Sequence, residues 1–491
     1  MKHLCVNMKS IKYFLVAFVL LALCSCSKTD YQKAVPADAT FVAMIDMQSI
    51  AEKGDFQHSE TMKNLQGWMG LVVSGKEQQE QMQEYLNDPM EMGFDFTMPI
   101  FVFKIGDDLG LVMKVGDEGD IKDFLKCLHQ QGLASVPTER QGMMSGTILD
   151  DVSYVYDSNT FLIVGGGSST KTKQLAISLM NLKDGESFVE TEAYDKMTAE
   201  SNTDLVFYAN LAALPTDISK QISAFLPKGV KNSDVELIEC VTFGKGELVM
   251  TSKWWGKTEK TQQLFTELNA NLHKIEGRYM DAVSEDVALW GCAGVKGDWL
   301  LGKLKENKDL KEALFMLERG IDIEQMIRAI DGDVALELPS EDVQSLMVRA
   351  QVKNTDFLAD VDYWKENMKD YGLTMRNVAQ NDYVLTADGK DMYWGVDKDN
   401  LYFSTHQPTA AHSSLLKSYE ADIKNSQLFI YGNLQALNKG YNTLSLSFSH
   451  IGMGRNMSGW KSLILKSASA DEAVLMIELK NKDENFLKQI F

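Results

Sequence analysis

Basic residues are scarce in this sequence. It contains 49 Lys and Arg against 69 Asp and Glu, and its formal net charge is -20. Nucleic acid carries a dense negative charge that would repel such a surface, so we expect no nucleic-acid partner. Proline is infrequent as well, at 8 residues. With 35 Gly, the composition is that of an ordinary folded protein rather than a disordered or collagen-like one.

Cysteine is also scarce, at 6 residues, and only three cysteines follow the N-terminal segment: Cys127, Cys240 and Cys292. Their separations match no metal-binding knuckle, and the sequence contains no Cys-x-x-Cys pair. In an oxidising envelope one disulfide could form among them, although buried thiols are the commoner state of such isolated residues. We predict no bound metal and no other cofactor.

Long hydrophobic runs are absent from the chain after its N-terminal segment. No later stretch reaches the roughly 18 apolar residues that a membrane-spanning helix needs. The one apolar run, Tyr13–Leu23, follows Lys9 and Lys12 and has the length of a signal-peptide core. Translation from either Met1 or Met8 would supply this signal. An uncleaved N-terminal anchor is the alternative.

The residues after the apolar run, Leu23-Cys24-Ser25-Cys26, resemble a bacterial lipobox. Cys26 fits the lipidated position better than Cys24, because the small Ser25 precedes it whereas the bulky Leu23 precedes Cys24. We therefore predict a lipoprotein signal peptide over residues 1–25, an acylated Cys26 as the mature N-terminus, and a polar tether over residues 26–34. Such an acidic protein is repelled by anionic lipid, so the acyl chains must hold it at the membrane.

The residues after Cys26 bear on location. Ser27 replaces the acidic residue that typically retains such lipoproteins at the inner membrane, so we expect attachment to the outer membrane. Surface-exported relatives typically carry an acidic stretch here, whereas this chain has Lys28 and then only Asp30. A periplasm-facing position is favoured over the cell surface.

The chain contains five short internal matches in the same order at a near-constant offset, which indicates a duplication. The strongest relates Asn202–Leu214 to Asn425–Leu437, with 7 identities in 13 positions. The others relate Asp38–Met47 to Asp286–Val295, Gly93–Phe96 to Gly320–Ile323, Leu111–Val115 to Leu346–Ala350, and Asp157–Phe161 to Asp397–Leu401. We expect two related halves, residues 35–277 and 278–491, each long enough to bury its own core.

Within each half, short apolar strands with hairpin turns alternate with amphipathic helices. This pattern predicts an α+β fold in which helices pack on an antiparallel sheet. The expected strands include Phe41–Met47, Ile100–Lys104, Leu109–Val115, Val152–Tyr156, Thr160–Val164 and Leu205–Ala209. The expected helices include Ser59–Lys76, Ile121–Gln131 and Lys171–Met180, with Glu259–Leu272 and Glu484–Phe491 closing the two halves.

These features together support a resemblance to a known family. The lipobox, the segment Val35–Met47 and the later Gly93-Phe94-Asp95 resemble a family of Bacteroidales lipoproteins of about 500 residues whose domain has no assigned function. The resemblance implies an envelope location and a duplicated α+β fold. It supplies no catalytic residues.

One set of motifs imitates a serine hydrolase of the penicillin-binding type. Ser168-Ser169-Thr170-Lys171, Tyr208-Ala209-Asn210 and Lys257-Thr258-Glu259 follow one another in the required order. However, Glu259 replaces an essential Gly, and the Tyr-x-Asn motif recurs at Tyr431 within the duplicated strand. We therefore expect no enzyme activity, with a cryptic serine hydrolase as the third hypothesis.

Other candidate sites are weaker still. Gly165–Thr172 imitates a P-loop but has Thr170 where Gly is needed, so a turn with a Ser/Thr helix cap is expected. His406 and His412 lack a metal-site spacing, and Asp397–Asn400 lacks the later residues of a calcium loop. The 26 Met fit core positions rather than a soft-metal site.

The adjacent Trp254 and Trp255 lie on an expected strand, so their side chains point to opposite faces. An exposed Trp in a groove would stack on sugar rings, whereas packing under the closing helix is the structural alternative. The sequence therefore predicts a lipid-anchored, non-catalytic binding or structural module with an unidentified protein or glycan ligand. An accessory glycan-binding lipoprotein is the second hypothesis.

Overall fold

The computed structural model describes residues 30–56, 62–63, 67, 75–149, 151–200, 203–214, 230–306, 311–312, 314, 321–339, 345–408, 413–440 and 457–490. The expected signal peptide and Cys26 lie outside this part of the chain. The chain forms two compact units. Unit 1 comprises Met1–Lys220, Lys231–Met250 and Lys482–Phe491, and unit 2 comprises Gln221–Val230 and Thr251–Asn481. Among the described residues, no helix has both the length and the hydropathy that crossing a membrane requires.

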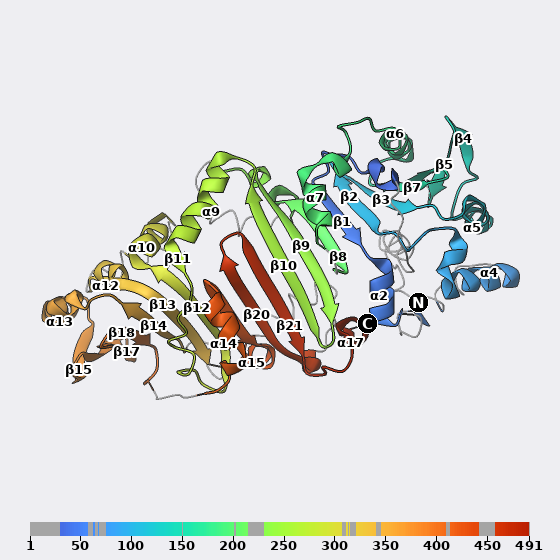
Figure 1. The fold of residues 1–491 in the computed structure, drawn as a ribbon. Coiled ribbons are helices and arrows are strands. Elements are labelled where there is room, and N and C mark those ends of the chain that lie inside the picture. Colours follow the sequence, from blue (N-terminus) through green and yellow to red (C-terminus); the bar gives the residue numbers. More distant parts are fainter. Residues whose placement is uncertain are drawn as a thin grey trace. The chain divides into compact units, whose positions relative to one another are not determined.

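Unit 1 is built on an antiparallel sheet with the strand order β4-β5-β6-β7-β3-β2-β1-β8-β9 (Figure 1). Its strands are β1 (Phe41–Ile45), β2 (Ile100–Ile105), β3 (Asp108–Lys114), β4 (Thr138–Arg140), β5 (Met143–Ile148), β6 (Val152–Tyr156), β7 (Thr160–Gly165), β8 (Leu205–Asn210) and β9 (Val235–Gly244). β10 (Glu247–Gly256) follows β9, and the chain passes from unit 1 to unit 2 within it.

The strands of unit 2 pair antiparallel in the order β15-β16-β17-β18-β14-β13-β12-β19-β20-β21. Its strands are β12 (Val287–Lys296), β13 (Ile330–Pro339), β14 (Met347–Val352), β15 (Thr374–Ala379), β16 (Asp382–Ala387), β17 (Lys390–Asp397), β18 (Asn400–Ser404), β19 (Leu428–Asn433), β20 (Trp460–Ser469) and β21 (Glu472–Leu479). A short strand, β11 (Leu272–His273), pairs with the end of β12. The predicted class, helices combined with an antiparallel sheet, is confirmed.

The two units use the same strand order. The expected counterparts Leu205–Tyr208 and Leu428–Tyr431 lie on β8 and β19. β8 pairs with β1, and β19 pairs with β12. Asp157–Phe161 and Asp397–Leu401 span the β6–β7 and β17–β18 hairpin turns.

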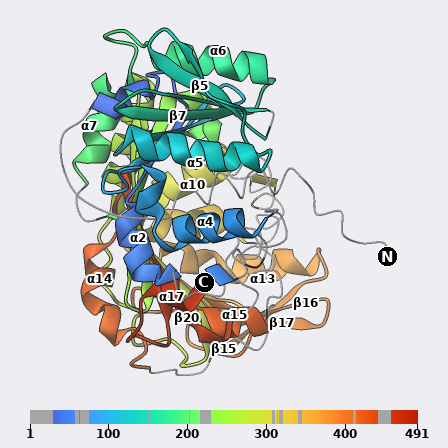
Figure 2. The same cartoon turned by 90° about the vertical axis from the view of Figure 1, so that its right-hand side faces the viewer.

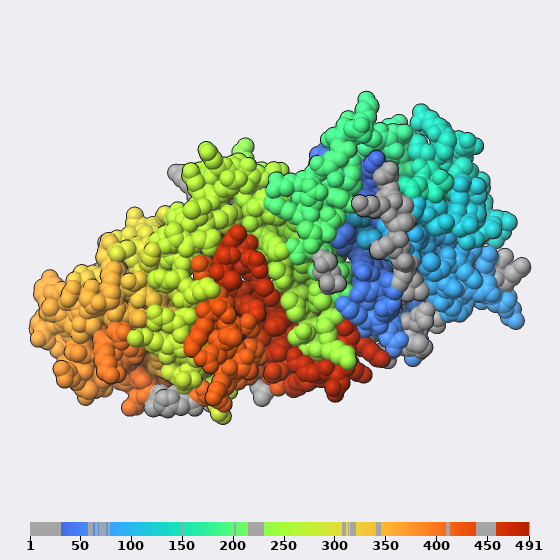
Figure 3. Space-filling model, in the orientation of Figure 1, coloured from blue at the N-terminus to red at the C-terminus, as the bar shows by residue number. Residues whose placement is uncertain are grey.

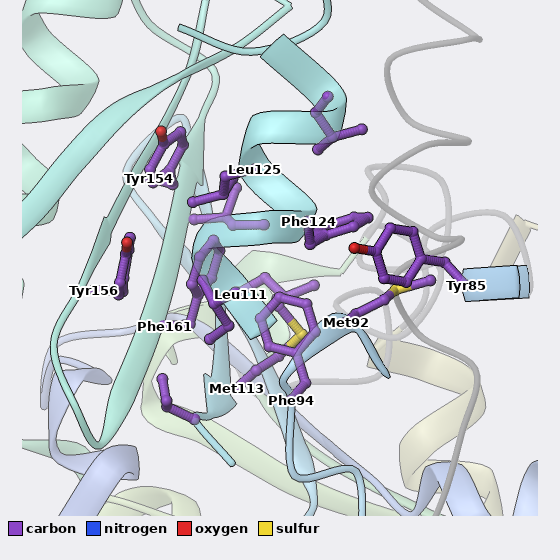
Figure 4. Close-up of a cluster of buried hydrophobic side chains, with 14 of the residues drawn as sticks. Tyr85, Met92, Phe94, Leu111, Met113, Phe124, Leu125, Tyr154, Tyr156 and Phe161 are labelled. Carbon is purple, nitrogen blue, oxygen red and sulfur yellow. The ribbon is translucent and has the colours of Figure 1, made fainter. Parts of the chain in front are cut away.

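The alternation of side chains along β6 explains how helices cover both faces of the unit 1 sheet. Tyr154 and Tyr156 point into a core cluster shared with helix α5 (Glu118–Gln130), and Phe161 of β7 lies in the same cluster (Figure 4). Ser153 points the other way, and its hydroxyl meets that of Thr172 on helix α6 (Ser169–Leu179) at 2.8 Å. Helices α5 and α6 therefore lie on opposite sides of these strands (Figure 2).

Unit 2 has two hydrophobic clusters. One lies beneath helix α13 (Val361–Lys369), where Trp394 is stacked on Tyr383 with ring centroids 4.5 Å apart. The other surrounds Trp290 on β12 and includes Phe429 of β19. The described residues of the two units also form helices α2 (Met47–Gly54), α4 (Lys76–Asn87), α7 (Glu192–Thr198), α10 (Gly297–Glu306), α12 (Ile323–Ala329), α14 (Glu420–Asn425) and α15 (Leu434–Gly440).

The two expected closing helices form, as α9 (Glu259–Asn271) and α17 (Phe486–Ile490). Their assignment to the compact units differs from the boundary expected at residue 277. α9 belongs to unit 2, and the C-terminal α17 belongs to unit 1. A helix joins the unit with which it buries most surface, and sequence order does not determine this.

Candidate functional site

The three residues of the imitated serine hydrolase site are not brought together. Ser168 precedes α6 and is exposed, and Lys171 lies in its first turn. Tyr208 is buried on β8, which is separated from β7 by β3, β2 and β1. Four strand spacings amount to about 19 Å, far beyond hydrogen-bond reach. This set of side chains cannot act as one catalytic centre.

Lys171 has a different partner. Its ammonium group lies 3.2 Å from the carboxylate of Asp108, a side chain that is almost completely buried. A Cβ atom on Gly167 would lie 3.2 Å from Oδ1 of Asp108, so this carboxylate sits beside the start of α6. A phosphate at the same helix terminus would meet that negative charge. The segment is therefore a turn that enters a helix, as expected, although the Ser168 hydroxyl makes no capping hydrogen bond.

Tyr208 serves a buried polar pair. Its phenol donates a short hydrogen bond to Glu236 on the neighbouring strand β9. Burial, and next the adjacent Glu236 carboxylate, raise the pKa of the Tyr208 phenol, which therefore stays protonated as a donor. Tyr156 is a natural contrast, because its buried hydroxyl has no hydrogen-bond partner in the described part of the chain.

We expect Tyr156→Phe and Tyr208→Phe to have opposite effects on unfolding free energy. Tyr156→Phe removes an unsatisfied hydroxyl and should leave stability unchanged or raise it by about 1 kcal/mol, whereas Tyr208→Phe deprives a buried carboxylate of a donor and should cost about 1–3 kcal/mol. Chemical denaturation at neutral pH compares the two. Equal effects from both variants would contradict the assigned roles.

Tyr156 also gives a prediction for the stability of the protein at alkaline pH. Burial raises the pKa of Tyr156 to about 12. An unfolded tyrosine loses its proton near pH 10, before the folded protein releases the proton of Tyr156. Rising pH therefore favours the unfolded state over this range. The contribution of Tyr156 to stability is complete below about pH 10 and falls between about pH 10 and 12. Tyr156→Phe should therefore reduce the loss of stability over this range.

Asp204 organises a polar cluster in unit 1. This carboxylate is 1% exposed and lies 2.6 Å from the ammonium group of Lys53 on α2. It also accepts a hydrogen bond from the backbone N–H of Phe243 at 2.7 Å and a short one from the Ser49 hydroxyl. Asp204 thus joins helix α2 to strand β9.

In unit 2 the buried carboxylate of Asp333 holds the loop at residues 276–278 in place. Its carboxylate is 0% exposed and accepts hydrogen bonds from three consecutive backbone N–H groups, those of Glu276, Gly277 and Arg278, at 2.8, 2.9 and 3.0 Å. Gly277 has a φ of +85°, which allows successive amides to point at one carboxylate.

Glu337, four residues later on β13, is buried as well. It accepts from the backbone N–H and the hydroxyl of Ser284 and lies 3.5 Å from Arg349. Asp333 and Glu337, the two buried carboxylates of β13, therefore both bind the loop that precedes β12. Their hydrogen-bonding capacity is used to hold the chain in place.

Sequence reasoning missed these carboxylates. None of them was singled out from the sequence. The available signal was weak: Asp333 and Glu337 share their β13 face with the apolar Ala335. Acidic residues in register with buried apolar ones indicate internal partners.

The residues weighed and set aside as metal ligands form no cluster in the described part of the chain. Nδ1 of His406 lies 3.3 Å from the Ser404 hydroxyl, and His412 lies outside the described residues. Asp397–Asn400 is a hairpin turn, in which Asp399 pairs with Arg278 at 2.8 Å. Arg278 consequently lowers the pKa of the Asp399 carboxyl.

Cys127, Cys240 and Cys292 are buried thiols, as favoured from the sequence. Burial raises the thiol pKa of Cys127 and Cys292, so neither is a reactive thiolate at neutral pH. Methionines occupy core positions in both units, with Met113 and Met368 each 1% exposed. This agrees with their predicted use as core filler.

Trp254 and Trp255 on β10 are both partly buried. The backbone N–H of Trp254 donates to the carbonyl of Asp471 at 2.8 Å.

Comparison with known proteins gives a family and a distant structural similarity. No curated protein matches the chain. Crystal form III of TP0453 matches with a TM-score of 0.29 at 10% identity, covering 50% of this chain and 89% of that one. Crystal form IV of TP0453 matches with a TM-score of 0.29 at 12% identity, covering 51% and 89%. The family model described as "Domain of unknown function (DUF4836)" matches residues 31–485, and this chain belongs to that family.

Proposed function

We propose that this protein is a lipid-anchored component of the cell envelope that acts as a non-catalytic binding or structural module. The observation that carries the proposal is the use of its buried charges. Asp204, Asp333 and Glu337 are each engaged by loops or helices of their own unit. Such partners hold loops and helices of the fold in place, so these buried carboxylates have a structural explanation.

The module consists of two copies of one α+β repeat. The shared strand order supports this, and so does the pairing register. The sequence matches make Val42 the counterpart of Trp290 and Tyr208 the counterpart of Tyr431. In the sheets, Val42 pairs with Tyr208 and Trp290 pairs with Tyr431. A slip of one residue in either pairing would turn every side chain of that strand to the other face. The identical register of the two strand pairs therefore supports a common origin of the repeats.

The lipid anchor follows from the sequence of the N-terminus. Acylation at Cys26 would attach the acidic protein to the outer membrane, and the residues after it favour the periplasmic side. The polar residues after Cys26 would connect the lipid to the folded part. The tether predicted over residues 26–34 is shorter than expected, because Asp30–Ala34 is a short helix in which Tyr31 is 1% exposed.

Cys26→Ser should abolish acylation, because the serine hydroxyl cannot replace the thiol that carries the lipid. We expect the variant in the soluble fraction or as an uncleaved precursor after fractionation of cells. The matched control Cys24→Ser should remain in the membrane fraction. Normal processing of Cys26→Ser together with loss of processing in Cys24→Ser would assign the lipid to Cys24 and refute the present assignment.

Ser168→Ala tests the non-catalytic part of the proposal. Because Ser168 is exposed and its hydroxyl makes no capping bond, we expect the midpoint of thermal unfolding to stay within experimental error. A β-lactam probe should label neither the wild type nor the variant. Covalent labelling that depends on Ser168 would show that it is a nucleophile.

A further inference from the structure

The first described segment of the chain is fixed to unit 1 by specific contacts. Tyr31 of the short helix η1 (Asp30–Ala34) is 1% exposed, and its phenol donates to the carbonyl of Pro99 at 2.6 Å. The side-chain amide of Gln32 donates to the hydroxyl of Tyr194 on α7 at 3.1 Å. The chain is therefore held against unit 1 from its first described residues onward.

η1 lies on the same side of the unit 1 sheet as helix α6. The rings of Tyr31 and Phe101 on β2 meet edge to face, with centroids 6.0 Å apart. Phe101 is joined to β6 by a row of paired residues: Val112 of β3, Leu162 of β7 and Val155 of β6. Paired residues point to one side of a sheet, as do residues two apart on a strand, so Phe101 shares its side with Ser153, which meets α6.

Helix α7 lies next to η1, as the contact between Gln32 and Tyr194 requires. In the space-filling view, blue residues from the start of the described chain reach the surface beside the green segment that contains α7 (Figure 3). Helix α5 lies on the other side of these strands, and α4 joins it there, because Met82 and Tyr85 of α4 share a core cluster with Phe124 of α5. The two sides of unit 1 are thus distinct, and η1 belongs to one of them.

Only a short stretch of chain separates η1 from the proposed lipid. Cys26 comes four positions before Asp30. An extended chain of four residues spans at most about 14 Å. Because acylation holds Cys26 at the bilayer surface, Asp30 must lie within about 14 Å of that surface.

Contact of the α5 side with the membrane would exceed this limit. A helix is about 10 Å across and packed layers lie about 10 Å apart, so η1 would then stand at least about 20 Å from the bilayer, beyond both α5 and the sheet. Four residues cannot span this distance. When the η1 side faces the membrane, the tether runs directly from Asp30 to the bilayer.

The charges of the helices agree with this orientation. α4 and α5 carry six acidic residues and three lysines, whereas α6 and α7 carry two acidic residues and three lysines. Even when the buried Asp108, the partner of Lys171, is counted with α6, the η1 side has no excess of negative charge on its helices. Anionic lipid therefore repels the α4 and α5 side more strongly.

We propose that the side of unit 1 that carries η1, α6 and α7 faces the membrane, that the side that carries α4 and α5 faces away from it, and that the short tether sets this orientation. The inference rests on the proposed acylation of Cys26. The partner of the η1 side is a lipid surface.

Nitroxide labels on the two sides of the sheet test the orientation. Gln174→Cys on α6 and Lys126→Cys on α5 are matched variants, because both positions are exposed on a helix. The thiols of Cys127, Cys240 and Cys292 are buried, so the new cysteine is the one that reacts readily. The acylated full chain is inserted into vesicles of phosphatidylethanolamine and phosphatidylglycerol that contain a lipid with a Ni(II)-chelating headgroup.

The Ni(II) ions shorten the relaxation time of a nearby nitroxide, and this effect falls steeply with distance. We expect the enhancement of relaxation at position 174 to exceed that at position 126 by at least about twofold, since the two helices lie on opposite sides of the sheet, about 20 Å apart. A soluble Ni(II) complex, added without the chelating lipid, should affect the two labels alike. Equal enhancement from the chelating lipid, or stronger enhancement at position 126, would overturn the proposed orientation.

A longer tether tests the cause of the orientation. Insertion of about 12 Gly and Ser residues after Ser27 gives the chain enough reach to let unit 1 turn over, so the difference between the two labels should disappear. A difference that persists would contradict control by the tether. Flotation with the vesicles reports the anchor separately: a chain that carries no lipid and does not float refutes the proposed acylation, whereas a floating chain with equal labels refutes the orientation alone.

Discussion

Replacing Asp333 with Ala should lower the free energy of unfolding by about 3–5 kcal/mol, the range for removing one partner of a buried charged network. Three backbone N–H groups, those of Glu276, Gly277 and Arg278, would lose their acceptor at once. Water could reach this fully buried position only if the loop moved. We therefore expect the loop before β12 to detach as well.

Asp331→Ala is the matched control, because this exposed carboxylate lies on the same strand two residues earlier. It should change stability by no more than about 0.5 kcal/mol. Hydrogen exchange followed by mass spectrometry would locate the effect, with faster exchange at residues 276–278 in Asp333→Ala alone. Equal stability of the two variants would show that the carboxylate does not fasten the loop.

Phe161→Ala should cost about 3–5 kcal/mol through the cavity that it creates in unit 1. The ring is 1% exposed, and its centroid lies 5.1 Å from that of Phe94 and 5.5 Å from that of Tyr156. It joins the strands to the segment that precedes β2, so its loss removes contacts on several elements (Figure 4).

Phe207→Ala makes the same chemical change at a partly exposed position of β8 and should cost clearly less. Chemical denaturation of both variants gives the comparison, and hydrogen exchange should show the loss of protection in unit 1 for Phe161→Ala. A loss from Phe161→Ala no larger than that from Phe207→Ala would contradict the position of Phe161 at the centre of the core.

Much of the fold could be predicted because strand periodicity and hairpin turns are local signals. The strands Val152–Tyr156 and Thr160–Val164 and the helices near residues 121–131 and 171–180 are present within a few residues of their expected bounds. The strand expected over Phe41–Met47 ends at Ile45, and Asp46 caps helix α2, which the sequence did not predict. The expected Ser59–Lys76 helix lies mostly outside the described residues.

The features that could not be predicted depend on contacts distant in sequence. The closing helices were expected as elements, but nothing local tells α17 to pack on α2 rather than near its own strands. Likewise, Asp333 is identified as a buried acceptor only once residues 276–278 approach it. The motifs at Ser168, Lys171 and Tyr208 suggested a site that does not form. Their order along the chain does not reveal that four strand spacings lie between β7, which precedes Ser168, and β8, which carries Tyr208.

The mass of the mature N-terminus tests the proposed envelope anchor most directly. Protein purified from the membrane fraction should yield, by intact-mass and peptide mass spectrometry, a chain that begins at Cys26 and carries acyl chains on that residue. An unmodified chain that begins at Met1 or Met8, or an acylated chain that begins at Cys24, would contradict the assignment.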